Sequence, residues 1–211
     1  MDLFYHKRYS SHFEFSETKE AVISTLIYED CAIKKITYSY IRAKKQLSDI
    51  EIFFSNGERS KWNADKLDSA YIRQFGISVS NDGKRVFFQT WENGLYCFDS
   101  HSGEKLWRTK SKRGITNIFV NDETLCCMQR EKALQIIDIR TGDVLKEKKA
   151  TDWGFAALDH NRIECQISAR KREIIDPGTL ESIYTVRSPD LNCLLVFSEK
   201  TENNGFFGNP I

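Results

Sequence analysis

Three stretches of this 211-residue chain repeat one another: Phe98–Trp107 (FDSHSGEKLW), Ile137–Lys146 (IDIRTGDVLK) and Ile175–Tyr184 (IDPGTLESIY). The aspartate at the second position of each stretch recurs at intervals of 39 and 38 residues, as Asp99, Asp138 and Asp176. A period near 40 residues, with strand-forming residues on both sides of a tight turn, is typical of β-propeller blades or of a β-array. Such blades commonly serve as binding scaffolds, so the repeat says more about architecture than about the ligand.

Each repeat divides into four short strands, and a second set of turns keeps the same period. These turns are Asn81-Asp82-Gly83, Asn121-Asp122-Glu123 and Asp159-His160-Asn161. Asn and Gly supply the positive φ angles that tight hairpins require. The sequence therefore predicts three four-stranded antiparallel blades over residues 77–187.

The two ends of the chain do not keep the period. Residues 1–76 predict an irregular β region, in which Asn63 caps one short helix from Ala64 to Phe75. Residues 188–211 predict a partial strand and a loose tail. The expected fold is mainly β: a partial or small β-propeller with an irregular N-terminal β region. The strands expected in the N-terminal region cover 21–28, 32–41, 50–55 and 59–62.

The repeated stretches resemble the blades of pyrroloquinoline-quinone-type and Trp-Asp-like β-propellers. In the first blade the match consists of Cys97, Asp99, Ser102, Gly103 and Trp107. The second blade has Ile136, Asp138, Thr141 and Gly142, with Lys146 in place of Trp; the third has Ile174, Asp176 and Thr179, with Gly178 displaced and Tyr184 in place of Trp.

The resemblance implies structural roles for these residues. In such blades the Asp accepts backbone hydrogen bonds in its turn, and the Trp packs between neighbouring sheets. The positions to which these roles carry over are Asp99, Gly103, Trp107, Asp138, Gly142 and Asp176.

Charge and composition exclude some classes of protein. Lys and Arg total 31 against 30 Asp and Glu, so there is no strong overall attraction to nucleic acid or to a membrane surface. The longest apolar run, Leu194–Phe197, is far too short to span a bilayer. The chain starts with no basic segment followed by an apolar run, so we expect a cytoplasmic protein without a membrane partner.

The six cysteines show no Cys-x-x-Cys spacing, which argues against a zinc ribbon or a thioredoxin-like site. Phe87, Cys126 and Cys165 are 39 residues apart and are expected at one equivalent, apolar strand position. We therefore expect buried thiols in a reducing compartment. Quinone-dependent propeller enzymes carry a vicinal disulfide, and Cys126-Cys127 is a vicinal pair. However, the resemblance implies that those enzymes form complete rings of eight blades, and this chain has room for at most five. The vicinal cysteines are therefore not interpreted as a quinone site.

No catalytic motif stands out. The sequence lacks a Gly-x-Ser-x-Gly elbow, a Gly-x-x-x-x-Gly-Lys phosphate loop and a Gly-x-Gly-x-x-Gly turn. The four histidines fall in expected loops or termini, where nothing makes them converge on a metal. Because one active site does not need the same carboxylate in three blades, the repeated aspartates are interpreted as structural. We expect no enzyme, no cofactor and no metal.

The leading functional hypothesis is a non-catalytic protein-binding module. By size and fold it resembles bacterial immunity proteins, and that resemblance implies occlusion of a cognate toxin by a loop-rich rim. Two alternatives stay open: a small-molecule-binding or enzymatic propeller with a central pocket, and an RNA-binding rim built from basic clusters at 110–113, 146–149 and 170–172. Aromatic and charged residues anchor protein interfaces, and the candidate partner contacts are Trp91, Glu92, Arg130, Glu131, Trp153 and Arg170.

Overall fold

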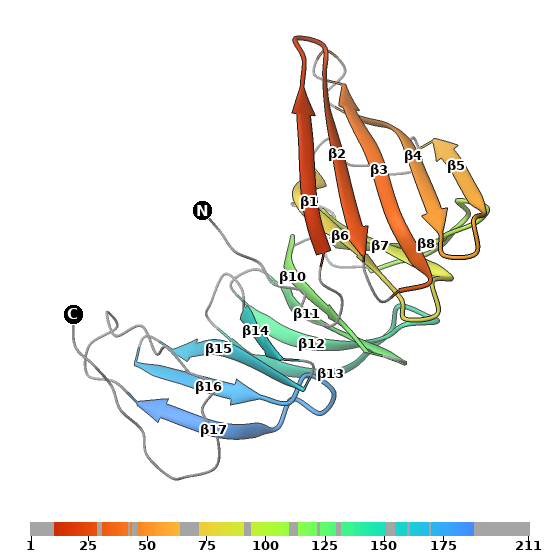
Figure 1. Ribbon diagram of the computed structural model, residues 1–211. Coiled ribbons are helices and arrows are strands. Elements are labelled where there is room, and N and C mark those ends of the chain that lie inside the picture. Colours follow the sequence, from red (N-terminus) through yellow and green to blue (C-terminus); the bar gives the residue numbers. More distant parts are fainter. Residues whose placement is uncertain are drawn as a thin grey trace, which may run out of the picture.

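The computed structural model shows an all-β protein built from four antiparallel sheets (Figure 1). It describes residues 11–28, 31–41, 43, 46–63, 72–90, 94–109, 114–121, 123–129, 132–150, 155–159, 161–168 and 170–187. The first sheet contains β1 (Ser11–Glu17), β2 (Ala21–Tyr28), β3 (Ile33–Ile41), β4 (Gln46–Phe54) and β5 (Arg59–Asn63). The second contains β6 (Ile72–Val79), β7 (Arg85–Thr90), β8 (Gly94–Asp99) and β9 (Lys105–Arg108). The third contains β10 (Ile115–Val120), β11 (Thr124–Gln129), β12 (Ala133–Asp138) and β13 (Val144–Lys149), and the fourth β14 (Phe155–Asp159), β15 (Arg162–Ser168), β16 (Lys171–Ile175) and β17 (Ser182–Arg187).

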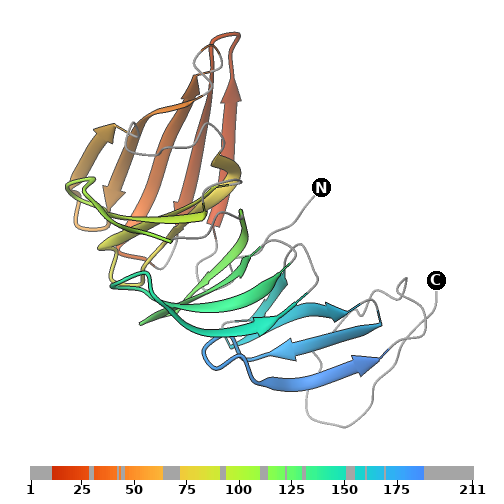
Figure 2. The ribbon, with the colours of Figure 1, turned by 180° about the vertical axis from the view of Figure 1, so that it is seen from behind.

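Every sheet is a meander, in which each strand pairs with the strand that precedes it in the chain. The sheets follow one another in an arc, with the first and the fourth sheet at its two ends (Figures 1 and 2). Among the described residues, no strand joins the fourth sheet to the first. The expected partial propeller is therefore confirmed, in an open form.

Burial follows from the position of each sheet in the arc. In β3, which belongs to the first sheet, Ile36 and Tyr38 are buried whereas Lys35 and Thr37 remain partly exposed. That alternation fits a sheet with a neighbour on one face only. The strand β8 is instead buried along nearly its whole length, since the second sheet lies between two others.

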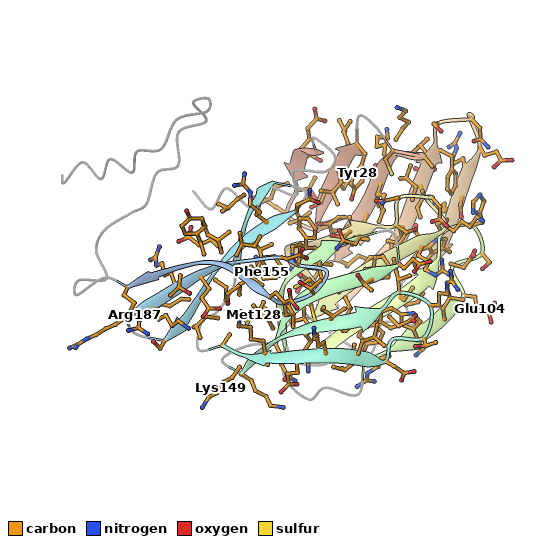
Figure 3. All side chains as sticks on the ribbon, turned by 90° about the horizontal axis from the view of Figure 1, so that it is seen from below. Tyr28, Glu104, Met128, Lys149, Phe155 and Arg187 are labelled. Atoms are coloured by element: carbon orange, nitrogen blue, oxygen red, sulfur yellow. The ribbon has the colours of Figure 1, made fainter. Side chains whose placement is uncertain are left out.

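Three apolar clusters hold consecutive sheets together, and we name them the first, second and third seam. The first seam joins the first two sheets and includes Ile52, Trp62 and Phe98. The second seam joins the second and third sheets and includes Phe87, Trp107 and Ile137. The third seam joins the third and fourth sheets and includes Met128, Phe155, Cys165 and Ile175 (Figure 3).

The structure corrects the prediction for the N-terminal region. The expected helix from Ala64 to Phe75 is wrong at its end, because residues 72–75 belong to β6; residues 64–71 lie outside the described residues. The strand β1 was not expected, and it gives the first sheet a fifth strand. The partial strand expected within 188–211 also lies outside the described residues.

One register assignment is also wrong. Cys126 pairs with Ile136 in the third sheet, but Ile174 of the fourth sheet pairs with Glu164, and Cys165 pairs with Glu173. The period at this point is 38 residues, so Cys165 is equivalent to Cys127. A shift of one residue turns a strand side chain to the other face, and Cys165 accordingly packs into the third seam.

Candidate partner-binding rim

The meander topology creates two opposite rims, because successive strand connections lie at alternate edges of a sheet. The turn rim consists of the turns 80–84, 99–104, 121–123, 139–143, 160–161 and 176–181. The loop rim consists of the connections 91–93, 130–132 and 169–170 within sheets and 109–114 and 150–154 between sheets.

The aspartates of the turn rim are hydrogen-bonded within their own turns. Oδ1 of Asp99 accepts hydrogen bonds from the backbone N–H groups of His101 and Ser102, at 3.0 and 2.8 Å. Partial burial alone would raise the pKa of Asp99, but the hydrogen bonds from Ser102 and His101 lower it. Asp138 accepts equivalent bonds from Arg140 and Thr141.

Asp176 repeats this arrangement in the fourth sheet, where it accepts bonds from the N–H groups of Gly178 and Thr179 at 2.7 and 3.1 Å. Each of the three carboxylates therefore stabilises its own hairpin, and each lies in a different sheet. Among the described residues, no three His, Cys, Asp or Glu side chains converge in a way that could hold a metal ion.

Two tryptophans connect neighbouring sheets at the turn rim. The indole Nε1 of Trp107 donates to the carbonyl oxygen of Ile139 at 3.1 Å, and its ring lies against Gly142. Trp62 lies against Gly103 in the same way and donates from Nε1 to the carbonyl oxygen of Ser100 at 3.3 Å. Each tryptophan thus packs on the turn of the following sheet.

The third seam uses lysines at this place. Lys146, at the position of Trp107, donates from Nζ to the carbonyl oxygen of Thr179 at 2.9 Å. Lys148 lies 2.6 Å from a carboxylate oxygen of Glu173, whose side chain is only 2% exposed. Lys171 and Ser182 also bind this carboxylate. Burial alone would raise the pKa of Glu173, but the hydrogen bonds from Lys148, Lys171 and Ser182 lower it to about 2.

The cysteines are free and buried. Cys126 and Cys127 lie in different seams, the third and the second, because adjacent strand residues point to opposite faces of the sheet. Cys31, Cys97 and Cys165 are also free and buried. Burial raises the pKa of Cys97 and of Cys127 to about 12, which disfavours the reactive thiolate.

Of the six candidate contacts, five lie outside the described residues: Trp91, Glu92, Arg130, Glu131 and Trp153. Arg170 is described and exposed, in the turn between β15 and β16. All six belong by their positions in the chain to connections of the loop rim. Of the six, the structure itself places only Arg170 on the loop rim.

In the structure, some residues of the basic clusters are paired within the fold and others are exposed. Lys146, Lys148 and Lys171 contact carbonyl or carboxylate groups in the third seam. Arg172 forms an ion pair with Glu164 at 3.2 Å. The exposed cations of the described loop rim and of the strand ends beside it are Arg108, Lys132, Lys149, Arg170 and Arg187.

Sequence reasoning missed two groups of residues. The repeat period does not identify Trp62, because Trp62 lies 45 residues before Trp107 instead of 39. The other group consists of exposed aliphatic side chains on the outermost strands of the last three sheets. Leu106 in β9 is 43% exposed, Leu145 in β13 is 57% exposed and Ile183 in β17 is 49% exposed. Their recurrence one residue before Trp107, Lys146 and Tyr184 was the available signal.

A protein-family model described as outer membrane protein assembly factor BamB matches residues 54–160. The match begins at the end of β4 and reaches past β14, so it contains both tryptophan contacts. No curated protein matches the chain.

Two solved structures share the fold. The crystal structure of BamB from Moraxella catarrhalis matches with a TM-score of 0.50 and 13% identity, covering 84% of this chain and 50% of that one. A chain in the crystal structure of a mitotic checkpoint complex matches with a TM-score of 0.54 and 13% identity, covering 74% and 47%. The present chain spans about half the length of either structure.

Proposed function

Because this chain belongs to the family described as outer membrane protein assembly factor BamB, we propose that it is a non-catalytic scaffold that binds a protein partner through its loop rim. The family description names an assembly factor, and the fold is that of a protein-interaction module. A specific interface would bury on the order of 1,600 Å2 in total.

The proposal rests on a difference between the charged residues of the two rims. On the turn rim, Asp99, Asp138 and Asp176 are engaged in holding their own hairpins. On the loop rim, Arg170 is exposed and makes no ion pair with another described residue. Thr109, Lys132 and Ala150 of the loop rim also form hydrogen bonds that hold the scaffold. Exposed loop positions such as Arg170 are the ones in which binding residues concentrate.

Within this function we propose the more specific role of an immunity protein, which would cover the active site of a cognate toxin in the cytoplasm. The absence of a catalytic motif in the sequence supports this role. The free thiols of the described cysteines are compatible with a reducing compartment. Co-purification with the product of an adjacent gene, at one copy of each, tests this version.

A photo-crosslinking amino acid placed at single positions tests the binding rim in the cells of origin. We expect protein adducts from positions 91, 153 and 170 of the loop rim. The matched controls are positions 84 and 140, which are exposed on the turn rim, and they should give none. Adducts from the turn rim alone, or from neither rim, would contradict the proposal.

A further inference from the structure

The outermost strands of the last three sheets carry a repeated surface pattern. An exposed aliphatic residue is followed four positions later by an exposed cation, as in Leu145 with Lys149 on β13 and Ile183 with Arg187 on β17. In all three strands the aliphatic residue is the extra residue of a β-bulge, because Leu106, Leu145 and Ile183 are skipped in the pairing with the neighbouring strand. In β13 and β17 the cation lies about 13 Å further along the same strand. We name these four residues, together with Leu106 of β9, the outer row; the sequence has Lys110 four residues after Leu106.

The two pairs occupy equivalent places in their sheets. Lys149 pairs with Ala133 at the start of β12, and Arg187 pairs with Lys171 at the start of β16. The interval is 38 residues for the aliphatic position and also for the cation. Figure 3 shows Lys149 and Arg187 near the arrowheads of their strands, on the side of the molecule away from Glu104.

Packing does not explain this pattern, and the bulges that protect a sheet edge explain the exposure of the aliphatic residue but not its type. The side chains of Leu145 and Ile183 are about half exposed, so they do not complete a core. Edge strands that avoid aggregation carry charged residues along the edge, whereas Val144 and Leu145 place two exposed aliphatic side chains next to each other.

The charges of the connections differ between the two rims. On the described turn rim the carboxylates are Asp82, Asp99, Glu104, Glu123, Asp143, Asp176 and Glu181, against the cations Lys84 and Arg140. On the described loop rim and the strand ends beside it the exposed charged residues are all cations: Arg108, Lys132, Lys149, Arg170 and Arg187. An incoming acidic surface is therefore attracted to the loop rim and repelled from the turn rim.

We propose that the outer row is a docking surface for a protein partner whose contact surface combines acidic and apolar side chains. This inference rests on the proposed function and specifies the chemistry of the partner. The aliphatic members contribute burial of apolar area, and Lys149 and Arg187 select carboxylates and orient the complex.

Nucleic acid fits the outer row less well. Domains that bind nucleic acid are usually strongly basic, with an isoelectric point above about 9, but this chain has an isoelectric point of about 7.6. Bases stack on aromatic rings, and the repeated position holds Leu, Leu and Ile. Cations alone would bind a phosphate backbone, so nucleic-acid binding does not explain the exposed aliphatic residue that precedes each cation.

Fluorescence anisotropy with three probes tests the proposal on the full chain. The probes are a short peptide of Glu, Leu and Gly, the same peptide with Lys in place of Glu, and an oligouridine. We expect the acidic peptide to bind most tightly. Charge reversal in K149E/R187E and removal of apolar area in L145S/I183S should each weaken its binding by about tenfold. The control K84E/R140E, on the turn rim, makes the same charge change as K149E/R187E and should stay within about twofold of the unmodified chain.

Three results would overturn the proposal: tighter binding of the oligouridine than of the acidic peptide, equal binding of the two peptides, or no binding of any probe. Unchanged circular dichroism of each variant shows that it folds. If crosslinking at the loop rim still yields a partner while the peptides fail, the scaffold function stands and only the outer row is lost. If crosslinking also fails, the function itself is wrong.

Discussion

The indole ring of Trp107 lies so close to Gly142 that a Cβ atom added to Gly142 would come within 2.7 Å of the ring carbons Cδ2 and Cε3. Gly142 also has a φ of +78°, in the left-handed region. One residue therefore meets two requirements at once. It turns the hairpin of the third sheet, and it leaves room for a side chain of the second.

Replacing this glycine should reveal both requirements. We expect Gly142→Ala to lower the free energy of unfolding by about 1–2 kcal/mol for the backbone and by about 1–3 kcal/mol more for the clash with Trp107. The matched control is Gly57→Ala, since Gly57 has a φ of +90° but nothing within 4 Å of the added atom. Urea unfolding measures both variants, and equal losses would show that the contact with Trp107 is unimportant.

The tryptophan itself can be removed. Trp107→Ala deletes a ring that is only 8% exposed, together with the hydrogen bond to Ile139, and should cost about 3–5 kcal/mol. Tyr184→Ala removes the aromatic residue at the equivalent place in the fourth sheet, which is 53% exposed, and should change stability by about 0.5 kcal/mol. Thermal and urea denaturation of the two variants distinguish them. A loss for Trp107→Ala as small as that expected for Tyr184→Ala would mean that the second seam does not depend on Trp107.

The buried carboxylate of Glu173 predicts a pH dependence. The pKa of Glu173 is lowered from 4.5 to about 2 in the folded chain, so the folded state favours the ionised form. The resulting stabilisation, about 3 kcal/mol, is complete above pH 4.5 and disappears as the pH falls toward 2. We expect Glu173→Gln to be less stable than the unmodified chain at pH 7, and the difference to shrink below pH 4.5. A difference that stays constant down to pH 2 would argue against an ionised Glu173; exposed Glu147, as Glu147→Gln, is the control.

The five described cysteines should react slowly with iodoacetamide in the native state. All five are buried, and burial raises the pKa of Cys31, Cys97, Cys126 and Cys127. Peptide mapping by mass spectrometry should show modification of these sites only after unfolding in urea. Rapid native labelling of Cys126 would indicate that the third seam opens, and rapid labelling of Cys127 would indicate that the second seam opens.

The sequence predicts those parts of the fold in which local chemistry repeats. The Asp-x-x-Ser/Thr-Gly hairpins at Asp99 and Asp138 carry their own turn geometry, so the second and third sheets could be placed from residue types alone. In the fourth sheet the hairpin at Asp176 lacks the following glycine and instead holds Leu180 at a φ of 58°. The first sheet has the tryptophan but not the repeated aspartate turn. Its place beside the second sheet is therefore shown only by the contact between Trp62 and Gly103 in the structure.

Other features depend on distant contacts. Residues 64–75 have a helical pattern and a good N-cap, but residues 72–75 belong to β6, where Ile72 pairs with Thr90 of β7. The register of Cys165 could not be read from spacing, because a period of 38 residues and one of 39 differ by one position and therefore by the face of the sheet. The cations of the candidate rim could be recognised in the sequence. Only the structure separated Lys149, which is exposed, from Lys148, which binds Glu173.

The replacement of tryptophan by lysine in the third seam gives the array two kinds of joint with opposite responses to the solvent. Salting-out anions such as sulfate favour apolar contacts like those of Trp62 and Trp107, while any electrolyte weakens the attraction between Lys148 and Glu173. The burial of Glu173 limits that weakening. Sulfate therefore acts mainly on the tryptophan joints and strengthens the end of the arc that holds them.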